Sequence, residues 1–238
     1  MARSAFPGFP EETLTFFRGL ERNNRREWFQ PRKPVFDEKV KRPMLELVAA
    51  LNSEIGRFAP LHVTEPESAI YRIYRDTRFS KDKKPYKTHI AAYFPRRGMD
   101  RHTASGYYFG VSHKEVAVGG GLYMPTPEIL LAVRNRIAER HGEFRKMVQS
   151  KALRKLLGEL HGDQLSRIPK GFAADHPAAE LLRYKQFFFY IELPPDLATS
   201  RMMQGEIRKR FQAMAPLVDF LNAPLAEAHP KKTPRVLL

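Results

Sequence analysis

Two segments rich in β-branched and aromatic residues, separated by a densely charged connection, constrain the fold of this chain most. The segments cover residues 69–75 and 88–94, and the connection between them ends at Pro85. Segments of this composition, bounded by a loop that contains proline, are typical of β-strands. The stretch therefore predicts two strands joined by a long loop, which Phe79 and Tyr86 are expected to anchor by burial.

Three further segments are expected to complete a sheet. Residues 105–112 alternate, with Tyr107 and Phe109 on one face, and residues 115–123 follow them after a short turn. Short connections favour an antiparallel meander, because parallel strands need long crossovers. Residues 186–193 carry aromatic side chains on both faces, which predicts a central strand of the same sheet.

Helical periodicity and helix-start residues predict helices before and after these strands. The helices are expected at residues 11–22, 28–29, 34–58, 126 to at least 137, 150–160, 176–184 and 200–221. Pro43 is expected to kink the third helix or to mark its true start, Gly162 to end the fifth, and Pro216 to kink or break the last. We therefore expect a single α+β domain over residues 8–225, an antiparallel sheet of about five strands with helices packed on it, and a fraying tail at residues 226–238.

The charged connection is the first candidate for a binding site. It holds seven cations from Arg72 to Lys87 against two acids, Asp76 and Asp82. Close packing of cations costs free energy unless an anion or an acid compensates them. The guanidinium fork suits phosphate or carboxylate, so an anion is expected at Arg75, Arg78, Lys81 and Lys87. The two acids either orient these cations toward a ligand or neutralise them as ordinary ion pairs.

Three other features are weaker candidates. Gly119, Gly120 and Gly121 follow a strand, where they serve either close strand packing or the approach of backbone N–H groups to an anion. Lys170 and Lys185 either bring a cation toward the same pocket or lie on the surface as ordinary lysines. His89, beside the basic connection, is the best single candidate for acid–base catalysis, because the pKa of histidine lies in the useful range.

Composition limits the chemistry and suggests the partner. The chain has 41 basic and 26 acidic residues and a formal net charge of +15, which attracts phosphate-bearing partners. It has no cysteine, which excludes disulfides and thiolate catalysis, and its eight histidines show no metal-binding spacing. No metal is expected, and no particular cofactor is indicated. No signal-peptide run and no stretch of roughly 18 apolar residues occur, so we expect a cytoplasmic protein without membrane association.

The motif R-D-T-R-F-S-K-D-K-K-P-Y-K-T-H at residues 75–89 closely resembles the core motif of a bacterial and fungal family, domain of unknown function 2461. Residues 118–125, V-G-G-G-L-Y-M-P, are similar to that family as well, as are P-K-G-F at 169–172, H-P-A-A-E-L-L-R-Y-K at 176–185, and the N-terminal F-F-R-G-L and N-N-R-R-E-W-F. The resemblance spans residues 8–225. It implies a bacterial type of conserved protein and no particular reaction, since the family is defined by similarity.

The leading functional hypothesis is binding of a small anionic, phosphate-bearing ligand in a cleft that the basic connection and the glycines line, with or without catalysis. The first alternative is nucleic-acid binding through the same basic surface. The excess charge is spread along the chain rather than gathered in one tail, which weakens that alternative. The second alternative is a non-enzymatic scaffold whose cations serve only internal ion pairs.

Overall fold

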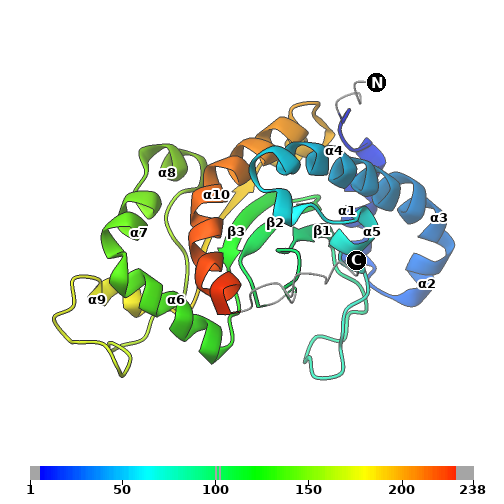
Figure 1. Cartoon of the computed structure of the whole chain (residues 1–238). Helices are drawn as coiled ribbons and strands as arrows, with labels where there is room; N and C mark the ends of the chain where they lie inside the picture. The colour runs from blue at the N-terminus through cyan, green and yellow to red at the C-terminus, as the bar shows by residue number, and fades with distance from the viewer. Residues whose placement is uncertain (1–5, 100, 102, 229–238) are drawn as a thin grey trace, which may run out of the picture.

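The sheet consists of antiparallel strands in the order β1-β2-β3-β4 (Figure 1). A computed structural model describes residues 6–99, 101 and 103–228 of the chain. The strands are β1 (His89–Phe94), β2 (Gly106–Ser112), β3 (Val116–Leu122) and β4 (Phe187–Leu193). Each neighbouring pair is antiparallel, with Tyr93 opposite Tyr108 and Gly119 opposite Tyr190. The predicted α+β class with an antiparallel sheet is confirmed.

Alternation along the strands gives the sheet one core face, which packs on the long helix α10 (Met203–Ala228). The ring of Phe211 lies 5.7 Å from that of Phe94 and 5.0 Å from that of Tyr107, measured between centroids. Gly120 faces the same helix, and a Cβ at this position would come within 3.1 Å of the sulfur of Met214. The middle glycine therefore lets the helix approach the sheet closely.

The N-terminal helices pack over the β1 side of this core. They are α1 (Glu11–Arg22), α2 (Arg26–Phe29), η1 (Gln30–Arg32), α3 (Lys33–Phe36), the π-helical turn η2 (Asp37–Lys41), α4 (Arg42–Phe58), η3 (Pro60–His62) and α5 (Pro66–Ala69). Pro43 lies in the first turn of α4, directly after the π-helical turn η2, so the predicted long helix changes its hydrogen-bond pattern just before the proline. The ring of Phe29 stacks on Tyr86 at 4.2 Å, so the end of the charged connection is anchored on these helices.

The remaining helices lie beside β4 and the C-terminal half of α10 (Figure 1). They are α6 (Pro127–Glu139), α7 (His141–Val148), α8 (Lys151–Leu157) and α9 (Ala179–Leu182), while η4 (Pro195–Thr199) lies before the start of α10, where the carbonyl oxygen of Ala198 accepts from the N–H of Phe9. Thr126 caps α6 as the sequence predicts, with its hydroxyl accepting from the N–H of Ile129. No helix of the described residues is long and apolar enough to cross a membrane.

Two strand predictions need correction. The expected strand at residues 69–75 is not regular: Ala69 ends α5, and the rest forms only the isolated bridges of Ile70 to Ala92 and Tyr74 to Tyr86. Its partner segment includes Pro85, which has no N–H to donate to a ladder. The segment 187–193 is β4 at the end of the strand order, not a central strand. Its aromatics occupy both faces because one set enters the core and the other lines a cavity.

Three further predictions also differ from the structure. α10 runs through Pro216 and Pro224 as one helix and ends at Ala228, within the expected tail; residues 229–238 lie outside the described residues. α8 ends at Leu157, because Gly158 with φ 76° terminates it before Gly162. Phe79 does not anchor the connection, since 94% of it is exposed, whereas Tyr86 is buried as predicted.

Candidate functional site

A cavity of about 510 Å³ lies on the sheet face opposite α10. Its floor consists of small residues on this face of the strands: Ala91, Gly106, Gly119 and Gly121. Its walls are the aromatic residues Tyr71, Tyr93, Tyr108, Tyr123, Phe188 and Tyr190. The register explains the arrangement, because Tyr93, Tyr108, Gly119 and Tyr190 form one row across the four strands. Small residues in the floor leave the space that the tyrosines surround.

The glycines of the floor cannot be replaced without moving the sheet. A Cβ at Gly119 would come within 2.7 Å of the carbonyl oxygen of Phe189, and one at Gly121 within 2.3 Å of that of Phe187. Gly121 also has φ +127°, a conformation that L side chains rarely adopt. All three glycines of the predicted run line the cavity, and close packing of strand and helix accounts for their identity.

Two cations share the face of one aromatic wall of the cavity. The Lys87 ammonium lies 5.0 Å and the Arg101 guanidinium 4.1 Å from the centre of the Tyr71 ring. Arg101 also donates to the carbonyl oxygens of Ser68 and Ala69, at 2.8 and 2.7 Å. These two bonds hold the guanidinium at the end of α5. Sequence reasoning missed Arg101 as a site residue, because its place depends on a helix end more than thirty residues earlier.

Lys87 is half-buried and has no acidic partner. Burial is the main cause that lowers the pKa of its ammonium, and the nearby charges of Arg72 and Arg101 lower it further. Among the described residues, no carboxylate forms an ion pair with Lys87, and no aspartate or glutamate lines the cavity. The cations at this end of the cavity therefore have no counter-charge from the acids that the structure describes.

His89, the predicted acid–base candidate, also lines the cavity. It is half-buried at the start of β1, and burial is the main cause that lowers the pKa of its imidazole, followed by the charge of Lys87. The ring is therefore neutral at neutral pH, and it can accept a proton from a neighbouring group. Lys87 and His89 are the two predicted titratable residues that the structure brings together.

Three tyrosines of the walls, Tyr93, Tyr108 and Tyr190, remain protonated at neutral pH. Burial raises the pKa values of Tyr93 and Tyr108, and burial followed by Glu192 raises the pKa of Tyr190 to about 12. The hydroxyl of Tyr93 donates to the carbonyl oxygen of Ala104 at 2.9 Å. The walls thus offer neutral aromatic surface with hydroxyl donors, which suits a flat ligand that also carries polar groups.

The other cations of the connection lie outside this cavity. Arg75 forms an ion pair with Asp82, and Arg78 forms one with Asp76, both at 2.7 Å. The guanidinium of Arg78 lowers the pKa of Asp76 to about 2, and the backbone N–H of Lys84, followed by Arg75, lowers that of Asp82. Of the two readings of these acids, the geometry matches ordinary ion pairing. Lys81 is exposed in the same connection and lines no part of the cavity.

Lys170 and Lys185 lie away from the cavity as well. Lys170 is exposed and borders a separate shallow hollow together with Arg167 and Arg183. Lys185 is also exposed, and its backbone N–H donates to the carbonyl oxygen of Asp163 at 2.8 Å. The expectation that one of them approaches the other candidate cations is not met by this arrangement.

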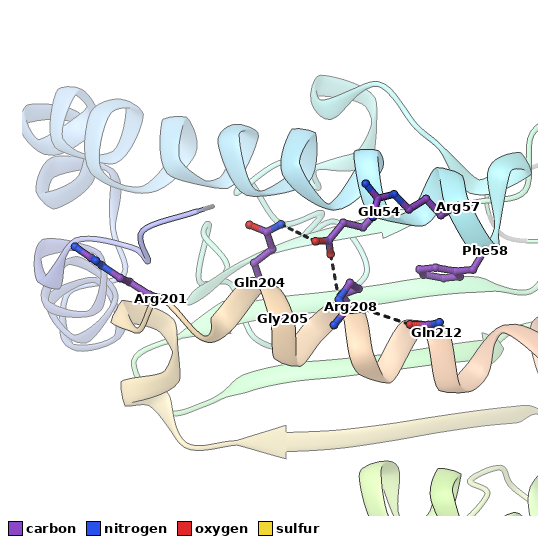
Figure 2. A pocket seen from close by; sticks show the side chains of 8 residues that line it. All are labelled: Glu54, Arg57, Phe58, Arg201, Gln204, Gly205, Arg208 and Gln212. Atoms are coloured by element: carbon purple, nitrogen blue, oxygen red, sulfur yellow. Dashed lines mark hydrogen bonds and ion pairs between the residues drawn. The ribbon is translucent and has the colours of Figure 1, made fainter. Parts of the chain in front are cut away.

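A second hollow, of about 550 Å³, lies between α4 and α10 (Figure 2). Its polar side chains already interact with one another. Arg208 contacts Glu54 at 3.4 Å and donates to Gln212 at 3.4 Å, while Gln204 donates to Glu54 at 3.2 Å. Glu54 compensates Arg208, and the other two cations of the hollow, Arg57 and Arg201, are exposed, whereas Lys87 and Arg101 of the sheet cavity are half-buried. We therefore place the candidate site in the sheet cavity.

Neither the described residues nor the comparisons indicate a metal-dependent reaction. No group of three or more histidines and acids in the described part of the chain could hold a metal ion.

A family model described as "Conserved hypothetical protein (DUF2461)" matches residues 12–220, which confirms the resemblance found in the motifs. No curated protein and no solved structure matches the chain.

Proposed function

Because the chain belongs to the DUF2461 family of conserved hypothetical proteins, whose description names no activity, we propose a function from the cavity geometry. The cavity binds a small anionic ligand that has a flat, largely apolar portion. Its phosphate or carboxylate group contacts Lys87 and Arg101, and its flat portion lies between the tyrosines over the glycine floor.

The observation that carries this proposal is the pair of cations at the rim without a matching acid. Like charges held together in a partly buried place raise the free energy of the protein unless an anion joins them. Lys87 and Arg101 meet this description, since both contact Tyr71 and no described carboxylate lines the cavity. A bound anion supplies a negative charge that none of the described acids provides there.

The size and walls of the cavity support a small ligand. Ligand cavities commonly measure roughly 300–1,000 Å³ and are lined mainly by apolar and aromatic side chains with a few polar groups. The present cavity, about 510 Å³, fits that range. An aromatic ring of a ligand can stack on Tyr108 or Tyr190, and the glycine floor leaves its face accessible.

Calorimetric titration with a panel of aromatic anions tests the proposal. Phenyl phosphate, adenosine 5′-monophosphate and benzoate are suitable probes, with inorganic phosphate as the comparison that lacks a ring. We expect at least one aromatic anion to bind more tightly than inorganic phosphate, and Lys87→Met to weaken it. Lys84→Met is the matched control, because Lys84 is exposed in the same connection and does not line the cavity. Equal binding by all three proteins would contradict the proposal.

A second candidate function rests on the exposed end of the connection. Phe79 is 94% exposed and has cationic neighbours, including the exposed Lys81 and Lys83. Aromatic side chains beside cations are a common platform for single-stranded nucleic acid. If six or more phosphates were neutralised, affinity should fall about a thousandfold between 50 and 200 mM salt. Titration of a labelled single-stranded oligonucleotide with the wild type and Phe79→Ala decides this: loss on substitution supports the candidate, and no binding rejects it.

A further inference from the structure

The position of Lys87 is typical of a reactive amine rather than of a surface lysine. Its backbone is fixed just before β1, where its N–H donates to the carbonyl oxygen of Ile73 at 2.8 Å. Its side chain is half-buried along the wall of the cavity, with the ammonium over the ring of Tyr71. The nitrogen therefore faces the space where a ligand binds, and it is the one lysine among the described residues that lines this space.

The surroundings of Lys87 favour the neutral form of its amine more than the surroundings of an exposed lysine do. The charged and titratable groups that face it are Arg72, Arg101 and His89, and the phenol of Tyr71 lies under it. Burial and the two arginines lower the pKa of the ammonium, and no acid opposes them. The cation–π contact acts in the other direction, but Arg101 occupies the same ring at the shorter distance of 4.1 Å. A lysine in such surroundings holds more free amine at neutral pH than an exposed one.

Lys87 contributes to anion binding while it is charged, but Arg101 can hold the anionic group alone when Lys87 reacts as a free amine. Arg101 stays charged at every relevant pH and is held by two carbonyl oxygens at the end of α5. It can therefore anchor an anionic group while Lys87 reacts. His89 lines the same cavity two residues after Lys87, and its neutral imidazole can take up and return a proton.

We infer that Lys87 forms an imine with a small aldehyde or ketone that also carries an anionic group. The inference rests on the proposed function and deepens it, because it names the substrate class of the same cavity. Arg101 binds the anionic group, Lys87 is the nucleophile, and His89 carries protons between the amine and the leaving oxygen.

The step balances without any other reactant. The free amine nitrogen of Lys87 forms a bond to the carbonyl carbon, and a proton moves from nitrogen to the carbonyl oxygen, which gives a carbinolamine. Cleavage of its C–O bond then releases one water, which contains the carbonyl oxygen and both protons of the amine. His89 accepts the first proton from the nitrogen and delivers it to the carbonyl oxygen, and it then carries the second proton from the nitrogen to the departing hydroxyl. Neither oxidant nor reductant is consumed, and hydrolysis reverses the step.

Borohydride trapping tests the inference. The probe is pyridoxal 5′-phosphate, an anionic aromatic aldehyde, and the comparison is pyridoxine 5′-phosphate, the corresponding alcohol, which cannot form an imine. The full chain is incubated with the aldehyde at pH 7 and reduced with sodium borohydride, and the modified lysines are identified by peptide mass spectrometry. A lowered pKa raises the fraction of free amine at neutral pH, and the cavity adds to this by holding the aldehyde beside the amine. We expect trapping at Lys87 to be at least about tenfold faster than at Lys81 or Lys84.

Two variants separate chemistry from binding. Lys87→Arg keeps the charge and removes the primary amine, so it should lose trapping in the cavity yet bind pyridoxine 5′-phosphate within about threefold of the wild type. His89→Gln should slow trapping at Lys87 about a hundredfold, the lower range for acid–base catalysis, without changing affinity for the alcohol. A merely structural role of His89 would instead alter both readouts.

The outcomes distinguish the two proposals. If the wild type binds pyridoxine 5′-phosphate but Lys87 is trapped no faster than Lys84, the inference is wrong and the proposed function stands. If neither compound binds and no preferential trapping occurs, both are wrong. Preferential trapping at Lys87 that Lys87→Arg abolishes supports both.

Discussion

Two groups of cations in one part of the chain have opposite surroundings. The connection cations, Arg75 and Arg78, lie outside the cavity and each pairs with an acid at 2.7 Å. The cavity cations, Lys87 and Arg101, are half-buried against Tyr71 and no described acid pairs with them there. Both groups carry positive charge and contain arginine, and all four residues lie between positions 75 and 101. What distinguishes them is whether a carboxylate is within reach.

The difference arises from short-range and long-range effects on the chain. Asp76 accepts from the N–H of Arg78 at 3.2 Å, and Asp82 accepts from that of Lys84 at 3.1 Å, so both acids bind backbone two residues ahead. These local turns hold each acid beside a cation of the same connection. Arg101 reaches the cavity by tertiary contacts with the end of α5, and none of the ion pairs of the described residues involves it. The candidate site is distinguished by cations that lack a carboxylate partner among the described residues, rather than by a high density of cations.

The largest effect is expected from filling the cavity floor. Gly121→Ala combines φ +127° with a Cβ that would lie 2.3 Å from the carbonyl oxygen of Phe187. Strain and overpacking together should lower the free energy of unfolding by about 3 kcal/mol, measured by urea denaturation. Gly158→Ala is the matched control: its φ is +76° and nothing lies near the added Cβ, so about 1 kcal/mol is expected. Equal decreases in the free energy of unfolding for the two variants would mean that the floor accommodates an added methyl group without strain and does not hold the cavity cations in place.

Ligand affinity tests most directly whether the cavity cations, rather than the connection cations, bind the anion. Lys87→Met should weaken binding of an aromatic phosphate by about ten- to a hundredfold, since a charge-assisted interaction contributes roughly 1.5–3 kcal/mol. Lys84→Met should leave the affinity unchanged, because Lys84 does not line the cavity. Calorimetry of both variants provides the measurement. A larger loss for Lys84→Met would move the anion from the cavity to the connection.

A smaller effect, of opposite sign to most core substitutions, is expected on stability. The folded-state pKa of Lys87 is lowered from the ordinary 10.5, so its charged form destabilises the fold at all pH values below that lowered pKa. Lys87→Met should therefore raise the melting temperature at pH 7. As pH rises from the lowered pKa toward 10.5, the unfolded wild type binds more protons than the folded one, and the wild type recovers stability. The difference in melting temperature between Lys87→Met and the wild type should shrink in that range. A lower melting temperature for the variant at pH 7 would contradict the claim that the charge of Lys87 is uncompensated.

Much of the fold could be predicted from the sequence, because it depends on local patterns. The alternation that places Tyr107 and Phe109 on one face predicts β2, and Thr126 before a proline predicts the start of α6. The irregular segment at residues 70–74 and the edge position of β4 depend on strand partners that no local pattern reveals.

The cavity was only partly predictable for the same reason. Lys87, His89 and the glycine run were expected at a ligand site, and the structure brings them together in one cavity. Arg75 and Arg78 were expected beside them, but the turns that pair them with acids have no signature as clear as their charge. Arg101 could not be selected among the other cations of its loop, because the carbonyl groups that hold it belong to a distant helix.

The smallest effect is expected at Arg78, where the sequence alone left two readings. If Arg78 formed a buried ion pair, Arg78→Ala would be strongly destabilising. If Arg78 contacted the ligand, the same substitution would lower the affinity for that ligand. The structure gives an ion pair with Asp76 in which 78% of the arginine side chain is exposed. Solvent and salt screen such a pair, so its loss should leave the melting temperature at pH 7 and 150 mM salt unchanged within error. Affinity for an aromatic phosphate should also be unchanged, since Arg78 lies outside the cavity. A tenfold loss of affinity would show that the connection cations contact the ligand, and the contrast with the cavity cations would then be wrong.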